Sequence, residues 1–141
     1  MNVKEVMTSN PRSVKPTESL QAAALVMREQ DTGVVPVVEN GHLIGMLTDR
    51  DIVIRAVADG RAQSGTVRDV LTKDLVVATP DMSTRDAEKL MGEHQVRRLP
   101  VVDGDKLVGI VSIGDLAVKE GADSRVGDTL ENISEGVKTR H

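Results

Sequence analysis

Two short stretches of the chain place a hydroxyl and a carboxylate three residues apart. Thr48 precedes Asp51, and Ser112 precedes Asp115, each directly after an apolar run. If a helix begins between them, the two groups form a capping box, because each side chain bonds a backbone amide of the first turn. The same groups can also bind a ligand, since a carboxylate accepts hydrogen bonds from sugar hydroxyls and a helix N-terminus attracts phosphate. The residues alone leave both interpretations open.

Two adjacent arginines are the second group that could do chemistry. Arg97 and Arg98 precede Leu99 and Pro100 on an expected strand, so their side chains should point to opposite faces. One of them would lie on the surface beside an ordinary carboxylate partner. The other is a candidate phosphate clamp, because guanidinium forms bidentate hydrogen bonds with phosphate oxygens.

Catalytic and metal chemistry find little support in the sequence. We find no nucleophile beside a base and an orienting residue, and no Walker loop, GxGxxG element or HExxH helix. The absence of cysteine excludes disulfides, thiolate zinc sites and cysteine nucleophiles, and the three histidines lack metal-ligand spacing. The hydroxyl and acid pairs could in principle transfer protons, but they occur twice at equivalent places, as duplicated binding sites would. We therefore expect no enzyme activity and no metal.

Composition limits the classes of partner. The 141 residues are 39% hydrophobic and 28% charged, with a formal net charge of −4, which allows a real core but gives no general attraction to nucleic acid. Phe, Tyr and Trp are absent, so a bound base would lie between aliphatic side chains and peptide planes. There is no long apolar run and no signal-peptide pattern. We expect a soluble, cytoplasmic protein without a membrane or nucleic-acid partner.

An internal repeat organises the whole chain. An ungapped offset of about 64 residues aligns two copies. Matched pairs include Val3 with Val67, Thr8 with Thr72, Pro16 with Pro80, Met27 with Met91, Pro36 with Pro100, Gly45 with Gly109 and Asp51 with Asp115. We place the first domain at 1–60, a small polar linker at 61–66, the second domain at 67–120 and a tail at 121–141. Within the tail, residues 124–130 echo the opening of each copy and predict a short helix that packs back or reaches a partner.

Each copy is predicted to be mixed α/β (α+β), in the order short strand, helix, two strands, helix. The apolar stripe of the first helix is Leu20, Ala23, Ala24 and Met27. Strands at 34–38 and 43–47 flank Asn40-Gly41 and predict a hairpin, which the second copy repeats with Asp103-Gly104 at its turn.

The second helix of each copy should open near Asp51 or Asp115. In the first copy the residues available for packing are Ile52, Val53, Ala56 and Val57. A copy of about 60 residues buries too little surface to be stable alone. We therefore expect the two sheets to pair, and two chains to form a homodimer, the commonest closed assembly.

The two signatures also carry a family resemblance. Gly45 to Asp51 and Gly109 to Asp115 resemble the CBS-domain pattern of glycine, two apolar residues, Thr or Ser, two variable residues and Asp. Each follows the family's apolar-Pro-Val-Val strand and its turn, and the likeness spans about residues 1–120, as in a CBS pair or Bateman module. Residues 46–54 and 93–100 resemble the small bacterial hypoxic response protein group. That group includes a member with cysteine-associated zinc, which this cysteine-free chain gives no reason to expect.

This resemblance implies a fold and a function. The fold is tandem CBS domains, each β-α-β-β-α, with the sheets packed as a pseudo-twofold pair. The function is a non-catalytic sensor that binds an adenosine-containing ligand between the domains: AMP or ATP foremost, otherwise ADP, NAD or S-adenosylmethionine. Its output would be a change in dimer geometry or in affinity for an unidentified protein partner. The alternatives are a constitutive dimeric scaffold with unused clefts and a DNA- or RNA-binding regulator, which the acidic charge and missing aromatics disfavour.

The resemblance further assigns residues to two clefts. Each cleft combines the signature of one copy with the residues that precede the strand proline in the other copy. The first cleft is expected to contain Thr48, Asp49, Arg50, Asp51, Ala78, Thr79, Arg97, Arg98, Leu99 and Pro100. The second is expected to contain Ser13, Val14, Val34, Val35, Pro36, Ser112 and Asp115. Only the first receives arginines, so phosphorylated ligands should fill it first. The second would be weak, empty or suited to an uncharged tail.

Overall fold

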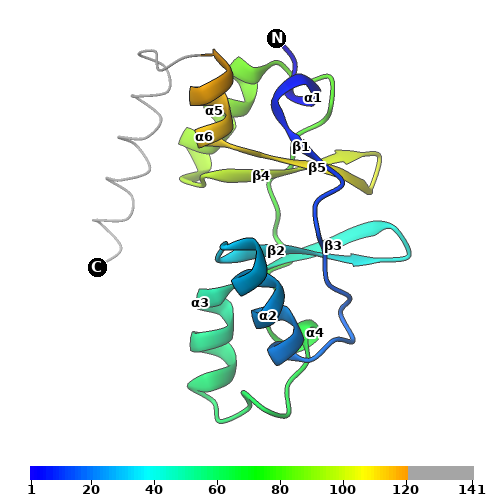
Figure 1. The fold of residues 1–141 in the computed structure, drawn as a ribbon, viewed down its shortest axis with the longest axis vertical. Coiled ribbons are helices and arrows are strands. Elements are labelled where there is room, and N and C mark those ends of the chain that lie inside the picture. Colours follow the sequence, from blue (N-terminus) through cyan, green and yellow to red (C-terminus); the bar gives the residue numbers. More distant parts are fainter. Residues whose placement is uncertain (121–141) are drawn as a thin grey trace. The chain divides into compact units, whose positions relative to one another are not determined.

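The computed structural model describes residues 1–120 and divides the chain into two compact units (Figure 1). The first-repeat unit is Arg12–Leu75, and the second-repeat unit joins Met1–Pro11 to the chain from Val76 onward. The predicted tail helix lies outside the described residues.

Each unit takes its opening segment from the other copy of the repeat. Helix α1 (Val3–Val6) belongs to the second-repeat unit, where Val3 and Val6 are buried with the core of the second copy. Helix α4 (Val67–Val70) places Val67 and Val70 in the core of the first-repeat unit. The predicted domain boundaries, 1–60 and 67–120, follow the repeat in the sequence. The compact units differ from these domains, because each unit contains the opening helix of the other copy.

The first-repeat unit is a β-hairpin with its helices on one side (Figure 1). Its remaining elements are α2 (Leu20–Gln30), β2 (Val34–Glu39), β3 (His42–Thr48), α3 (Asp49–Ile52) and a π-helical turn, η1 (Val53–Val57). The antiparallel strands are joined at Asn40-Gly41, whose φ angles of 54° and 83° suit the predicted two-residue hairpin turn. Two isolated β-bridges extend this hairpin: Val14 pairs with Val37, and Thr72 pairs with Met46.

The second-repeat unit repeats this arrangement. Its elements are β1 (Thr8–Ser9), α5 (Thr84–His94), β4 (Arg98–Asp103), β5 (Lys106–Ser112) and α6 (Ile113–Glu120), and β5 pairs antiparallel with both β1 and β4. The hairpin turn falls one residue later than predicted, because Asp103 still pairs with Lys106 and Gly104 takes the positive φ of 65°. The mixed α/β class is confirmed, but both copies open with one turn of helix.

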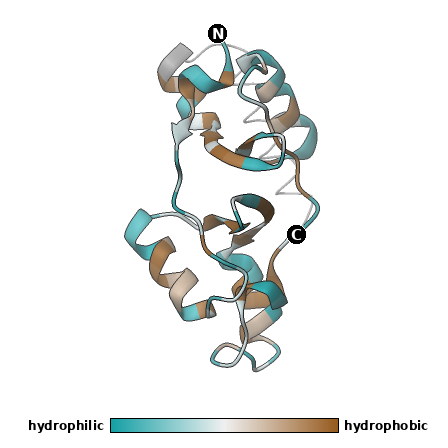
Figure 2. Ribbon diagram, turned by 90° about the vertical axis from the view of Figure 1, so that its right-hand side faces the viewer, coloured by the Kyte–Doolittle hydropathy of each residue, from teal (hydrophilic) through white to brown (hydrophobic). Residues whose placement is uncertain are grey.

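The cores are aliphatic, and hydrophobic residues gather in the strands of each unit (Figure 2). The predicted stripe of α2 needs one correction: Ala24 is exposed and Val26 is buried instead. The buried face is centred near Ala23, so the next residue turns outward. Residues 1–120 contain no helix that is both long and apolar enough for a membrane crossing.

The second helix of the first copy packs less than predicted. Ala56 is fully buried and Ile52 packs against the core, but Val53 and Val57 are 54% and 53% exposed. The π-helical turn at Val53–Val57 changes the residue spacing, so these positions do not share one buried face.

Candidate functional site

The first signature forms the junction between β3 and α3. The Thr48 hydroxyl accepts a hydrogen bond from the Asp51 amide at 3.0 Å, and the Asp51 Oδ2 accepts one from the Thr48 amide at 3.0 Å. The capping-box interpretation is therefore confirmed for this copy. The reciprocal pair also fixes the carboxylate at the end of the strand.

Asp51 has further partners from outside this turn. It is only 9% exposed, and the Thr72 hydroxyl lies 3.2 Å from its Oδ2 and 3.3 Å from its Oδ1. The Arg55 Nε lies 4.0 Å from Oδ1. A carboxylate has about four acceptor positions. Asp51 therefore keeps acceptor capacity for the donors of a ligand while its own orientation is held.

The second signature forms the junction between β5 and α6. The Ser112 amide donates to the Asp115 Oδ2 at 3.1 Å, and the Ser112 hydroxyl accepts from the Asp115 amide at 3.0 Å. Asp115 is half-buried. Across residues 1–120, Asp115 shows only these bonds with Ser112, so its carboxylate is held by fewer groups than that of Asp51.

Hairpin register sets the neighbours of each signature within its own unit. Val34 pairs with Thr48 in the first-repeat unit, and Arg98 pairs with Ser112 in the second-repeat unit. The Arg97 carbonyl accepts a hydrogen bond from the Ile113 amide at 2.9 Å, and both arginine side chains are exposed. The predicted first cleft combines these arginines with Asp51, which belongs to the first-repeat unit. This combination of residues from different units stays a prediction.

Several predicted cleft residues have side chains inside the cores. Val14, Val35, Ala78 and Leu99 are at most 2% exposed, so a ligand could meet only their backbone. The buried prolines Pro36 and Pro100 use their carbonyls to accept from the amides of Val14 and Ala78. Ser13, Thr79 and Arg50 are exposed.

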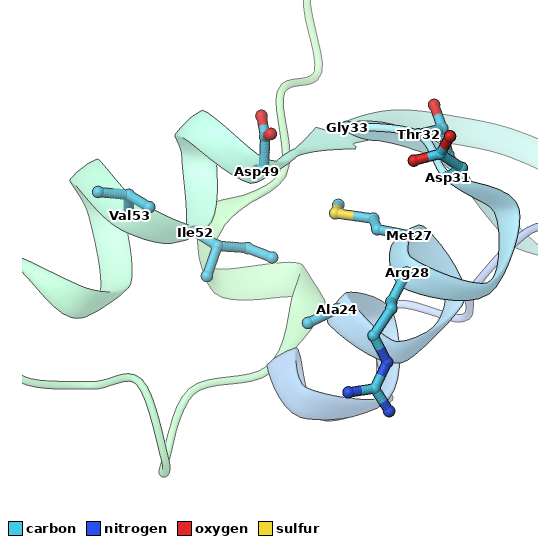
Figure 3. Close-up of a pocket in the computed structure, with 9 residues that line it drawn as sticks. All are labelled: Ala24, Met27, Arg28, Asp31, Thr32, Gly33, Asp49, Ile52 and Val53. Atoms are coloured by element: carbon cyan, nitrogen blue, oxygen red, sulfur yellow. The ribbon is translucent and has the colours of Figure 1, made fainter.

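Asp49 has surroundings different from those of Asp51. It borders a hollow of about 520 Å³ between α2 and α3, drawn in Figure 3. The other residues around the hollow are Ala24, Met27, Arg28, Asp31, Thr32, Gly33, Ile52 and Val53. The Asp49 amide donates to the Gly33 carbonyl at 2.9 Å, and a Cβ at Gly33 would lie 2.8 Å from the Asp49 Oδ2. Asp49 therefore borders this hollow, whereas Asp51 bonds Thr72.

Sequence reasoning missed Thr72 and Arg55 as partners of Asp51. The repeat did contain one signal, because Thr72 and Thr8 are equivalent residues in the openings of the two copies. That signal could not reveal the contact, since it does not show which signature each opening approaches.

Comparison with known proteins gives a consistent result. The model of the family described as "CBS domain" matches residues 3–57 and 67–119. The chain is 47% identical over 133 residues to the CBS domain-containing protein YhcV of Bacillus subtilis, covering 94% of this chain and 95% of that protein. It is 39% identical over 116 residues to Hypoxic response protein 1 of Mycobacterium tuberculosis, covering 81% of each. The predicted likeness to this group is confirmed.

Solved structures agree in fold. The structure of CBSX2 in complex with AMP superimposes with a TM-score of 0.75 and 28% identity, covering 84% of this chain and 95% of that one. The CBS domain pair of protein MJ0100, in complex with 5′-methylthioadenosine and S-adenosyl-L-methionine, gives a TM-score of 0.75 and 25% identity, covering 86% and 96%. With two matched copies, two similar hairpin units and relatives of nearly the same length, this chain belongs to the CBS domain family.

Proposed function

We propose that this chain is a non-catalytic regulatory module that binds an adenosine-containing ligand through its two signatures. The observation that carries the proposal is the buried Asp51 carboxylate, which is fixed by Thr48 and Thr72 yet retains acceptor capacity. A pre-oriented carboxylate suits two ribose hydroxyls, because charge-assisted hydrogen bonds are short and directional.

The ligands of two similar proteins support the adenosine class. AMP on CBSX2 shares its adenosine with 5′-methylthioadenosine and S-adenosyl-L-methionine on MJ0100. These ligands differ in the group attached to the 5′ position of the ribose. We therefore propose that the shared nucleoside is recognised by the signatures, with AMP or ATP as the foremost candidates. The regulatory output would be a change in the affinity of the chain for itself or for another protein, which requires the ligand to favour one state.

The first prediction is that stabilisation follows adenosine rather than nucleotides in general. Base recognition by aliphatic side chains and peptide groups, combined with a ribose-binding carboxylate, should favour AMP, ATP or S-adenosylmethionine over GTP and UTP. A ligand present at 100 times its Kd should raise the free energy of unfolding by about 2.7 kcal/mol. Thermal unfolding with each compound measures this. Equal shifts with ATP, GTP and UTP would exclude an adenosine-specific site.

A constitutive scaffold is the second candidate function, and one set of observations favours it. Four exposed apolar residues mark the helical side of the first-repeat unit: Leu25, Val53, Ile54 and Val57. They lie on α2 and on the turns after α3, and Val53 also lines the hollow in Figure 3. A scaffold would use such a face without any ligand. The absence of a thermal shift with every adenosine compound would favour this function.

The second prediction is that the chain forms a homodimer through this apolar face. Burial of this face against a second copy would stabilise the dimer by roughly 25 cal/mol for each Å² of apolar surface removed from water. Val53→Glu combined with Val57→Glu should therefore convert a species of twice the chain mass into a monomer, as measured by light scattering. Lys89→Glu is a charge control, because Lys89 is exposed in the other unit. A wild-type chain that is already monomeric at high concentration would contradict the prediction.

A further inference from the structure

The Asp51 carboxylate is held by a residue that lies 21 positions further along the chain. The Thr72 hydroxyl reaches both carboxylate oxygens, at 3.2 and 3.3 Å. The backbone of Thr72 is itself fixed, because its amide donates to the Met46 carbonyl at 2.8 Å and its carbonyl accepts from the Met46 amide at 3.0 Å. Met46 lies on β3, the strand that ends at Thr48. The hydroxyl therefore has a defined position relative to the signature.

Arg55 makes a second connection between Asp51 and the same segment. Its Nε lies 4.0 Å from the Asp51 Oδ1, and its Nη1 donates to the carbonyls of Val70 and Leu71, both at 3.3 Å. These carbonyls end α4, where backbone acceptors lack partners within the helix. The Arg55 side chain is 51% exposed, so its ion pair alone contributes little. Its bonds to the carbonyls make it a support for the segment that carries Thr72.

The segment is anchored by apolar burial. Val67, Val70 and Leu71 are at most 5% exposed in the core of the first-repeat unit. Gly45 permits the close approach, because a Cβ there would lie 2.7 Å from the Thr72 carbonyl oxygen. Docking of residues 67–72 and the orientation of Asp51 are therefore parts of one packed arrangement.

We propose that Thr72, supported by Arg55, is the positioning residue of Asp51, so that ligand binding at Asp51 depends on docking of residues 67–72. The inference rests on the proposed function, because it adds a requirement to the same carboxylate. Thr72 acts through Asp51 by fixing the direction of the remaining acceptor positions. Ligand occupancy and order in the segment after the linker are then coupled in both directions.

The other copy supplies a matched control. Thr8 is the repeat equivalent of Thr72, but Thr8 is exposed. In the described part of the chain, the bonds of Asp115 are those with Ser112. A change at Thr8 therefore alters the equivalent opening without touching a signature carboxylate.

The first experiment measures AMP affinity by calorimetry. Thr72→Val removes the hydroxyl at nearly constant volume and should weaken AMP binding by about 10-fold, the effect of losing a hydrogen bond to a charged group. Thr72→Ser keeps the hydroxyl and should restore affinity to within about 3-fold of wild type. Thr8→Val should leave AMP affinity unchanged. Unchanged affinity in Thr72→Val would overturn the proposal even if that variant is less stable.

The second experiment needs no ligand. Backbone hydrogen exchange in the ligand-free protein should become faster at the Met46 and Thr72 amides in Asp51→Asn and Arg55→Gln. The Val14 and Val38 amides, which form the other bridge of the same unit, should keep their rates. Equal acceleration at all four amides would indicate general loosening and overturn the specific link.

The two experiments separate the possible failures. A wild-type chain that binds no adenosine compound, yet shows the selective change in exchange, would refute the proposed ligand while supporting the link between Asp51 and residues 67–72. A chain that binds AMP normally in Thr72→Val would support the proposed function and refute the positioning role.

Discussion

Asp51→Ala is expected to abolish tight binding of AMP or ATP, whereas Asp115→Ala should spare it. Asp51 is the more buried of the two carboxylates and the one held by a second hydroxyl. Hydrogen bonds to a charged group contribute roughly 1.5 to 3 kcal/mol each, so losing two ribose contacts should weaken binding by about 100-fold or more. Isothermal calorimetry with AMP and ATP measures both variants.

The two substitutions share one loss, because each removes the acid of a capping box. Asp51→Ala also removes the acceptor of the Thr72 hydroxyl, so it should lower the free energy of unfolding by more than Asp115→Ala does. Urea unfolding of both variants without ligand therefore accompanies the calorimetry, and loss of binding in an Asp51→Ala protein that is still folded reports on the ligand site. Two identical binding events, or loss of the tight event in Asp115→Ala, would show that the assignment is wrong.

The arginines provide an independent check of this assignment. The family resemblance groups Arg97 and Arg98 with Asp51, whereas strand register places Arg98 beside Ser112 within one unit. Adding Arg98→Ala to each aspartate variant forms a double-mutant cycle, which reports whether the two side chains act on the same bound phosphate. Coupling of Arg98 to Asp51 supports the predicted first cleft. Coupling to Asp115 would assign the phosphate to the second signature.

Gly45→Ala is expected to be the most destabilising single-methyl addition among the signature glycines. A Cβ at Gly45 would contact the Leu71 side chain and lie 2.7 Å from the Thr72 carbonyl oxygen. The carbonyl cannot move freely, because it accepts from the Met46 amide. Overpacking of this kind costs about 1 to 3 kcal/mol, and we expect the upper half of that range. Urea unfolding of the ligand-free protein measures the loss.

Two other glycines serve as controls. A Cβ at Gly109, the equivalent position, would meet the flexible end of Met7 and lie 3.0 Å from the Thr8 carbonyl oxygen, so Gly109→Ala should cost less. A Cβ at Gly114 would come no closer than 3.7 Å to the Ser112 hydroxyl. Because Gly114 lies in α6, Gly114→Ala should be neutral or stabilising by up to about 1 kcal/mol. A larger loss at Gly114 than at Gly45 would refute the steric explanation.

The sequence by itself determined the features that depend on near neighbours. The repeat, the turn at Asn40-Gly41 and the capping pair of Thr48 and Asp51 all rest on residues within a few positions of one another or on direct comparison of the copies. Their geometry follows from backbone preferences and first-turn hydrogen bonds, so a local pattern is enough to predict them. The family resemblance rested on these same local features.

Only the tertiary structure decided which segments meet. The opening of each copy is buried in the other unit, and this exchange brings Thr72 to Asp51 across 21 positions. The same packing leaves Ala24 exposed and buries Val26. The sequence could not place α4, because this helix is too short to be stable alone and is held by burial of Val67 and Val70. A short apolar opening fits either core by composition, so the repeat pattern does not show which core each opening joins.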